Sequence, residues 1–288
     1  MSKIAKLTLI GLLFVCGTAM AQIDTPQPSP AGSVYSKVGL TDVTIDYFRP
    51  GVKGRKIFGS GDAFLEQFGE VWRTGANSGS MVTFSSDLKV AGQDVEAGKY
   101  QIVTIPGESE WQVMLISEPI GGNESAYDES KAVVKTTVKS AKTMNTVERM
   151  TFQITDISED NTTANIQFSW ADVMWNLPLE VNYKEAVMKE IAEKTQVNPA
   201  VYSQAANFYL SQGIELEKAL DYMNKYLAIG ENNMQFWNVH TKARILAAMG
   251  KKKEAIEVAK KSMEGAKSNH NGDFGYVKRN QDLIDSLK

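Results

Sequence analysis

The sequence has very little cysteine and histidine. Among 288 residues there is one cysteine, Cys16, and there are two histidines, His240 and His270. Cys16 lies in a predicted signal peptide, so the mature chain has no thiol for a disulfide, a nucleophile or a metal site. Both histidines lie in the last fifth of the chain, where we interpret His240 as a packing or surface residue and His270 as a loop residue. A Ser-His-Asp hydrolase is therefore disfavoured, and the sequence predicts no metal and no cofactor.

Long hydrophobic runs are equally scarce, and the one that stands out is at the N-terminus. Lys3 and Lys6 precede an apolar run over residues 7–15, and Ala19-Met20-Ala21 follows it. A basic start, a short apolar run and small residues are typical of a secretory signal peptide over residues 1–21. We expect cleavage before Gln22 and export from the cytoplasm, with no transmembrane segment in the mature chain. A lipoprotein anchor is disfavoured because Val15 stands where such a signal needs a small residue.

Excess positive charge is also absent from the first half. Residues 22–182 carry 13 Lys and Arg against 21 Asp and Glu, a net charge of −8, whereas residues 183–288 carry 16 against 13, a net charge of +3. An acidic half argues against a nucleic-acid partner, because phosphate binding needs a basic face. The P-loop pattern G-x-x-x-x-G-K-[ST] is missing as well. The change in charge near residue 182 supports a division into two domains.

Residues 33–182 predict a β-rich domain. Short alternating segments follow one another, namely TDVTIDYF, MVTF, LKV, KYQIVTI, WQVMLIS, AVVKTTVKS, MTFQITDIS, TANIQFSW and LPLEV, and turn-forming residues separate them. Only DAFLEQF, residues 62–68, indicates a short helix. Strands without helices between them indicate an antiparallel β-sandwich-like domain. The proline-containing residues 22–32 predict an extended linker before it.

Residues 183–288 have a helical period instead. Asn198-Pro199 marks a helix start, because asparagine caps helices and proline suits the first position. Two stretches around Gly213 and Gly250 resemble each other with a spacing of 36 to 37 residues. They predict two tetratricopeptide-like helical hairpins, with helices at 183–194 and 274–287 as caps. The fold class is therefore α+β, and a protein or peptide partner is expected on the helical tail.

Three motifs in the first half carry a family resemblance. FRPGVKGRKIFG (48–59), FGEVWRTGAN (68–77) and LKVAGQDVEAGKYQIVTIPGESEW (88–111) occur in this order. Residues 25–181 thereby resemble the bacterial secreted family known as domain of unknown function 2911. The resemblance implies a β-rich protein of the bacterial envelope, periplasmic or extracellular. It implies no activity and no catalytic residue.

The first of these motifs contains a cluster of cations within an acidic domain. Arg49, Lys53, Arg55 and Lys56 fall within eight residues, beside two glycines that free the backbone. Such a loop could place several N–H groups around one anion. The favoured interpretation is plainer, namely a solvated loop or pairing with acids such as Asp46.

The second motif places Trp72, Arg73, Thr74 and Asn77 at a polar corner. Because neighbouring side chains in a strand point to opposite faces, one of Trp72 and Arg73 should be buried. The corner could bind a carboxylate, a phosphate or a sugar. Equally, Arg73 could pair with Glu66 or Glu70 while Asn77 only shapes a turn.

Two other sets of residues are weaker candidates. Glu66 and Glu70 could form a carboxylate pair if a helix placed them on one face, but surface acids are the favoured interpretation. Trp170 and Trp175 could stack on a sugar, but core packing is favoured. The sequence thus favours a binding or assembly module of the bacterial envelope. The alternatives are a non-metal enzyme and a ligand-capture protein for an anionic or glycan substrate, acting through loop 49–56 and Arg73.

Overall fold

The computed structural model describes residues 25–288, so the predicted signal peptide lies outside the described residues. The chain divides into two compact units between Val181 and Asn182. We name them the β unit (residues 25–181) and the helical unit (residues 182–288), and we describe each by itself. In the described part of the chain, no helix has both the length and the apolar character needed to cross a membrane.

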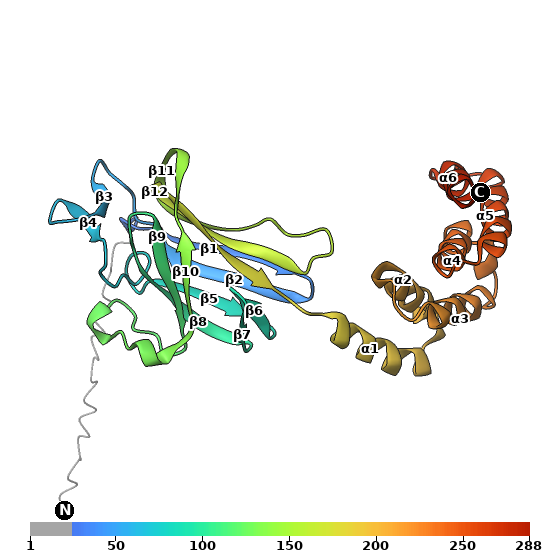
Figure 1. The fold of residues 1–288 in the computed structure, drawn as a ribbon, viewed down its shortest axis with the longest axis horizontal. Coiled ribbons are helices and arrows are strands. Elements are labelled where there is room, and N and C mark those ends of the chain that lie inside the picture. Colours follow the sequence, from blue (N-terminus) through green and yellow to red (C-terminus); the bar gives the residue numbers. More distant parts are fainter. Residues whose placement is uncertain (1–24) are drawn as a thin grey trace, which may run out of the picture. The chain divides into compact units, whose positions relative to one another are not determined.

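The β unit is built from two antiparallel sheets and one small parallel pair (Figure 1). The larger sheet has the order β1-β2-β5-β8-β9-β10, the second has the order β11-β12-β6-β7, and β3 pairs with β4. The strands are β1 (Ala31–Val38), β2 (Thr41–Phe48), β3 (Lys56–Gly59), β4 (Phe64–Gln67), β5 (Ser80–Phe84), β6 (Leu88–Val90), β7 (Gln93–Val95), β8 (Gly98–Ile105), β9 (Glu110–Ile116), β10 (Ala132–Lys139), β11 (Ala141–Thr155) and β12 (Thr163–Glu180). The predicted antiparallel β-sandwich-like architecture is confirmed.

The core between the sheets is rich in aromatic rings. Val43, Ile45 and Tyr47 alternate inward from β2, as their spacing predicts. The rings of Trp72 and Trp170 stack at a centroid distance of 5.8 Å, and further edge-on contacts join them to neighbouring rings. Burying such large side chains supplies much of the stability of a unit that has no disulfide.

Two predictions about the strands are wrong. DAFLEQF does not form a helix: Gly61 turns the chain at φ +86°, and residues 64–67 form β4 alongside β3. A segment of seven residues is too short to be stable as a helix by itself, so tertiary pairing decides its conformation. TANIQFSW and LPLEV are not separate strands but parts of one strand, β12. Ala171, at φ +53°, lies where the pairing with β11 shifts its register, and the strand continues beyond it.

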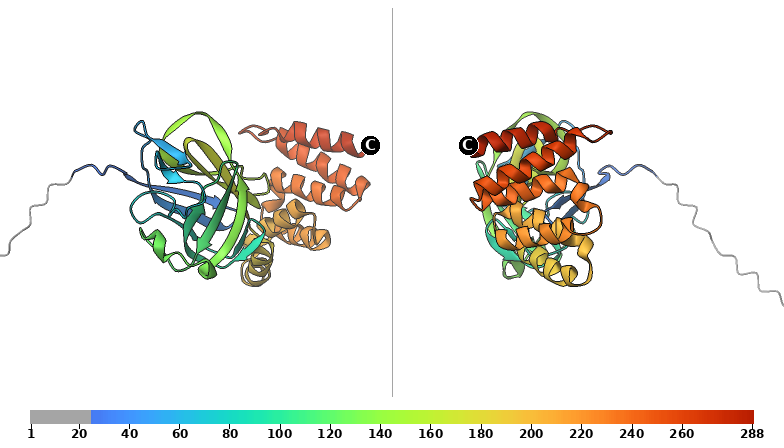
Figure 2. Two further views of the ribbon diagram at one scale, coloured as in Figure 1. Left: turned by 60° about the vertical axis from the view of Figure 1, so that its left-hand side comes forward. Right: turned by 90° about the vertical axis from the view of Figure 1, so that its right-hand side faces the viewer.

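The helical unit contains six helices in its described residues, and both views of Figure 2 show the later ones lying side by side. They are α1 (Lys184–Val197), α2 (Tyr202–Gln212), α3 (Leu216–Leu227), α4 (Phe236–Ala248), α5 (Lys252–Lys267) and α6 (Tyr276–Leu287). Gly213 and Gly250 turn the chain at φ +64° and +74° after α2 and near the end of α4. The Asn198 side chain accepts a hydrogen bond from Ala200 N at 3.0 Å, so the predicted helix start is confirmed.

A buried polar group joins the last three helices. Asn280 Oδ1 lies 2.8 Å from His240 Nδ1, and Asn280 Nδ2 donates to Ser262 Oγ at 2.9 Å and to the Tyr276 carbonyl at 2.7 Å. His240 is therefore a packing residue, which is one of the two roles that the sequence leaves open. Burial lowers its pKa, although the hydrogen bond to Asn280 works in the opposite direction.

We expect Asn280→Ala to destabilise the helical unit by about 2 kcal/mol, because it leaves buried polar groups on His240 and Ser262 without their partner. Chemical unfolding followed by circular dichroism at the helical minimum measures this loss. The exposed neighbour Gln281 is the matched position, and Gln281→Ala should change stability by less than about 0.5 kcal/mol. Equal effects of the two substitutions would contradict the assigned role of Asn280.

Candidate functional site

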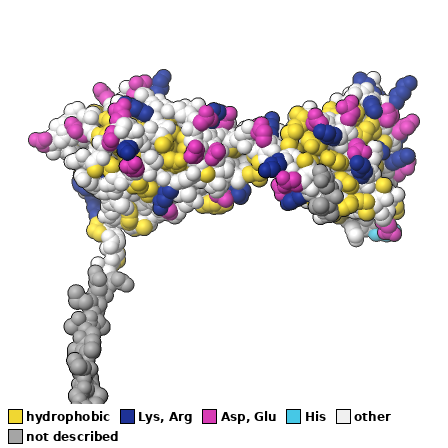
Figure 3. Space-filling view, turned by 90° about the horizontal axis from the view of Figure 1, so that it is seen from below, with side chains coloured by type: hydrophobic (Ala, Val, Ile, Leu, Met, Phe, Trp, Pro, Cys, Tyr) yellow, Lys and Arg dark blue, Asp and Glu magenta, His cyan; other side chains and the backbone are white. Residues whose placement is uncertain are grey.

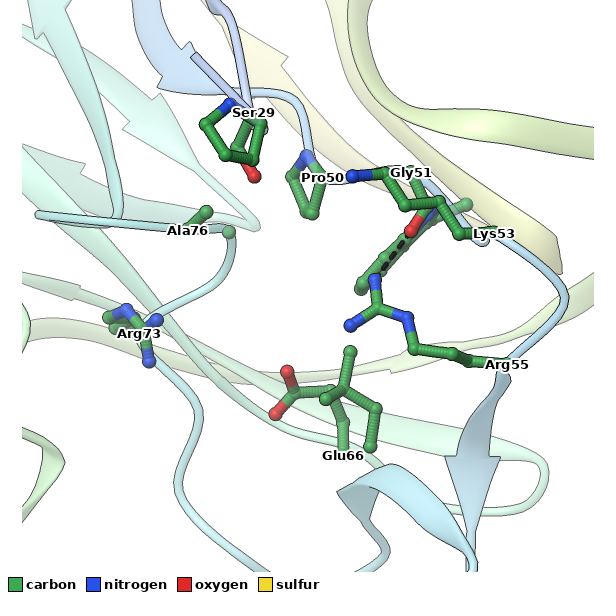
Figure 4. A pocket seen from close by; sticks show the side chains of 12 residues that line it. Ser29, Pro50, Gly51, Lys53, Arg55, Glu66, Arg73 and Ala76 are labelled. Atoms are coloured by element: carbon green, nitrogen blue, oxygen red, sulfur yellow. Dashed lines mark hydrogen bonds between the residues drawn. The ribbon is translucent and has the colours of Figure 1, made fainter.

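A pocket of about 340 Å³ opens in the β unit, and three of the chain segments that line it supply its charged side chains. Loop 49–56 contributes Lys53 and Arg55, β4 contributes Glu66, and the corner after Trp72 contributes Arg73. Figure 4 shows the Arg55 guanidinium and the Glu66 carboxylate pointing into the same space, with Arg73 across from Arg55. The volume is at the lower end of the range for pockets that hold small molecules.

Loop 49–56 is held in a defined conformation, and its residues 53–56 are exposed to solvent, as the favoured interpretation expects. Arg55 donates from Nη2 to the Gly51 carbonyl at 2.5 Å and from Nε to the Val52 carbonyl at 3.2 Å, which closes the loop on itself. Glu148 holds it from outside, since its Oε1 accepts from Lys53 N at 2.9 Å and its carbonyl from Val52 N at 2.7 Å. These contacts fix the direction of the Arg55 side chain and hold Lys53 through its backbone N–H.

The corner is fixed by Trp72 and Thr74. Trp72 exchanges two backbone hydrogen bonds with Thr104, at 2.8 and 2.9 Å, and its side chain is 2% exposed. The hydroxyl groups of Thr74 and Thr104 lie 2.9 Å apart in the core. Because Trp72 points inward, Arg73 points away from the core, as the alternation of a strand predicts.

Arg73 is held in place by two contacts. Its Nε donates to the Asn77 carbonyl at 3.0 Å, and its Nη1 forms an ion pair with Glu124. Of the two alternatives that the sequence leaves open for Arg73, pairing with Glu66 or Glu70 is therefore wrong. Glu124 comes from the loop between β9 and β10, fifty-one residues further along the chain, and no local pattern indicates that contact. Burial raises the pKa of Glu124, but the hydrogen bond from Arg73, backbone hydrogen bonds and the charge of Arg73 together outweigh burial and lower the pKa.

Glu66 is the unusual titratable group of the pocket. Burial raises its pKa to about 7, the nearby charges of Arg73 and Arg55 oppose that shift, and the Glu124 charge adds to it. No hydrogen bond to its carboxylate comes from any residue that the structure describes. A carboxyl group of this kind exchanges a proton near neutral pH, which is the range that acid–base chemistry uses.

The structure brings together three of the eight residues that the sequence proposed. Lys53, Arg55 and Arg73 line the pocket. The other five do not line it. Arg49 donates to the Met150 carbonyl at 3.2 Å and to Thr151 Oγ1 at 3.0 Å, and Lys56 Nζ lies 5.6 Å from the centre of the Phe64 ring. Trp72 and Thr74 are buried, and Asn77 is exposed and accepts a hydrogen bond from Arg73 at its carbonyl. None of the four loop cations pairs with Asp46 or with any other described acid.

The sequence also missed parts of the site. The favoured interpretation makes Glu66 a surface acid, whereas Glu66 is half-buried on the face of β4 that it shares with Phe64, and the apolar neighbour Leu65 gives no sign of this. Pro28 and Ser29 line the pocket from the predicted linker, and nothing in a proline-containing segment indicates this. Trp170 is fully buried, as predicted, and it is among the residues that line the pocket.

The arrangement suits recognition of an anion. Three cations surround one carboxyl group with an elevated pKa, and apolar walls from Pro50 and Leu65 adjoin them. Across the described residues, no group of three His, Cys, Asp or Glu side chains could hold a metal ion. The donors of the site are therefore guanidinium, ammonium and backbone N–H groups.

Comparison of the chain with known proteins finds one family. No curated protein and no solved structure matches the chain. A family model described as protein of unknown function (DUF2911) matches residues 29–179, which is just over half of the chain and includes every residue that lines the pocket except Pro28. The chain belongs to the family of proteins of unknown function DUF2911.

Proposed function

We propose that this chain is an exported binding module of the bacterial envelope, and that its β unit captures a small anionic ligand in the pocket. The observation that carries the proposal is the convergence of Lys53, Arg55 and Arg73 on one open space. Cations held close together repel one another, and an anion bound between them relieves that repulsion. Export is proposed from the N-terminal signal pattern.

The cations keep much of their hydrogen-bonding capacity. An arginine has five N–H donors, and both Arg55 and Arg73 use two of them within the protein. Neither Lys53 nor Arg55 has an ion pair with any described residue. Arg73 has one, with Glu124, and both side chains are about 30% exposed. An incoming anion therefore meets donors that are positioned but not satisfied.

The helical unit is proposed to be tetratricopeptide-like and to bind a protein or peptide partner. Its two glycine-turned hairpins repeat with a spacing of 37 residues between the glycines. Repeats of this length stack side by side and present extended surfaces. On the face that Figure 3 shows, hydrophobic side chains gather on this unit.

Thermal unfolding with a panel of anions tests the capture of an anion. Phosphate, sulfate, acetate and malonate are compared at constant ionic strength, with glucose as the neutral control. A ligand of the native state must raise the melting temperature, so at least one anion should do so in a saturable way. If none does, the proposed function is wrong.

Substitution places the binding in the pocket. We expect Arg73→Gln to weaken the anion that binds best by about tenfold or more, because charge-assisted hydrogen bonds are lost and Glu124 is left unpaired. Lys56→Gln is the control, since it also removes one positive charge from the β unit but from a side chain outside the pocket. Titration calorimetry gives both affinities. Equal losses would mean that general surface charge, not the pocket, attracts the anion.

A second candidate function is acid–base catalysis by Glu66, and its pKa of about 7 favours it. An enzyme of this kind would hydrolyse or rearrange an anionic substrate held by the three cations. Its rate would change around pH 7 and would fall at least a hundredfold in Glu66→Gln. Ligand capture predicts binding without turnover, so product analysis after prolonged incubation with a bound anion separates the two functions.

A further inference from the structure

We infer that the anion recognised by this pocket is a phosphate monoester, bound by Lys53, Arg55 and Arg73 with one proton shared between the ester and the Glu66 carboxyl group. The inference rests on the proposed capture of an anion and adds the chemical class of the ligand. Four observations carry it: the number of donors, the charge of the site, the proton at Glu66 and the apolar walls.

The donors exceed what a carboxylate ligand can use. A carboxylate offers two oxygens in one plane, which a single arginine can satisfy, whereas a phosphate offers three strong acceptor oxygens. Here Lys53 and Arg55 come from loop 49–56, and Arg73 comes from the corner across the pocket. Gly75 and Ala76 also line it, and their backbone N–H groups have no acceptor among the described residues. Donors on several sides match an anion with oxygens on several sides.

The charge of the site matches a dianion. Three cations face two carboxyl groups, Glu66 and Glu124, because Glu124 is paired with Arg73. The site therefore has a net charge of +1 when Glu66 is ionised and +2 when Glu66 carries its proton. A phosphate monoester dianion neutralises the protonated site, and the monoanion neutralises the ionised one. Ester and carboxyl group thus balance the site in either state.

The position of Glu66 makes sharing a proton favourable. Arg55, Arg73 and Glu124 are the charged groups that act on it, and Lys53 lies on the same pocket wall as Arg55. Burial gives Glu66 a pKa of about 7, and the second pKa of a phosphate monoester is about 6. One proton between them forms a hydrogen bond whichever group holds it. Carboxylate and sulfate ligands have no such proton near neutral pH, so they face repulsion once Glu66 ionises.

The remaining walls favour an organic ester over inorganic phosphate. Pro50, Leu65 and Ala76 present apolar surface around the cations, and Leu65 is 43% exposed. The pocket volume of about 340 Å³ exceeds what one phosphate group fills. An apolar group attached to the phosphate would cover this surface and gain from its burial.

Three probes with the same ring test the inference. Phenyl phosphate, phenyl sulfate and benzoate are titrated into the full mature chain by calorimetry at pH 7.5, in two buffers with different ionisation enthalpies. We expect phenyl phosphate to bind at least tenfold more tightly than the other two and to take up about half a proton to one proton. Comparable or tighter binding of benzoate or phenyl sulfate would overturn the phosphate assignment and leave anion capture standing. If no probe binds, anion capture fails as well.

Substitution of Glu66 tests the shared proton. In Glu66→Gln, phenyl phosphate binding at pH 6 should stay within about threefold, while the proton uptake and the pH dependence that remain after correcting for the ester itself should disappear. Unchanged uptake in this variant would overturn the role of Glu66. Lys56→Gln should retain both the affinity and the uptake, and thermal unfolding of each variant confirms that it is folded.

The phosphate monoester could belong to a soluble molecule or to a lipid headgroup, and a further arm separates the sources. The chain is sedimented with vesicles of phosphatidylcholine containing phosphatidic acid, and with phosphatidylcholine alone. Binding that requires phosphatidic acid and is displaced by phenyl phosphate assigns a lipid source. Tight phenyl phosphate binding without vesicle binding assigns a soluble ester, and either result supports the class.

Discussion

Replacing Glu66 by glutamine should stabilise the β unit by about 3 kcal/mol at pH 8 and leave its stability at pH 4.5 nearly unchanged. Burial raises the pKa of Glu66 from 4.5 to about 7, so the folded state prefers the protonated form. As pH rises from 4.5 to 7, the unfolded chain ionises freely while the folded chain must hold a proton or a buried charge. The native chain therefore loses stability between pH 4.5 and 7 and stays less stable at higher pH. For such a pKa shift the loss is about 3 kcal/mol.

Glutamine has the shape of the protonated acid and cannot ionise, so the variant should not show this loss. Urea unfolding at several pH values measures the free energy of unfolding of both proteins. Tryptophan fluorescence reports on the β unit, because four of the five tryptophans, all but Trp237, lie there. Glu70→Gln is the control, since Glu70 is exposed and lies four residues away. The difference in free energy of unfolding between the Glu66→Gln variant and the native chain should grow from pH 4.5 to 7. Parallel curves would show that Glu66 is well solvated, and the proton-sharing inference would lose its basis.

The sequence predicts the fold better than the site, and β2 shows why. Val43, Ile45 and Tyr47 point inward and alternate with outward polar residues, so neighbouring residues alone show the two-residue period of a strand. The turn at Gly213 and the cap at Asn198 are likewise local signals. Where the local signal is short, as in residues 62–68, pairing with β3 decides the conformation and the helix prediction fails.

The site depends on contacts between distant residues, and one sequence does not contain them. Arg73 meets Glu124 from a loop fifty-one residues away, and Arg49 turns to Thr151 on β11. The loop cations could be proposed from composition, but which of them share a pocket depends on how loop 49–56 is held by Glu148. Glu66 became significant only when burial showed what its surroundings do to its pKa.

Gly79 affects both the stability of the β unit and the position of Arg73 in the pocket. It has φ +80°, and a Cβ there would lie 2.5 Å from the Arg73 carbonyl oxygen and 2.6 Å from Gln101 Nε2. Gln101 is fully buried, and its amide holds the β9–β10 loop through Gly121, at 3.0 and 3.1 Å. That loop carries Glu124, the partner of Arg73. Added bulk at Gly79 therefore displaces both ends of the Arg73 ion pair.

We expect Gly79→Ala to destabilise the β unit by about 3 to 4 kcal/mol, of which about 1 to 2 come from the left-handed backbone and the rest from overpacking. Gly92→Ala is a close control, because Gly92 has φ +78° and open space around its Cβ position, so it should cost only the backbone part. Urea unfolding followed by tryptophan fluorescence compares the two, and calorimetry should show weaker anion binding in Gly79→Ala alone. Equal destabilisation would mean that Arg73 and Gln101 move aside cheaply. In that case the corner would not hold Arg73 firmly enough to define a binding site.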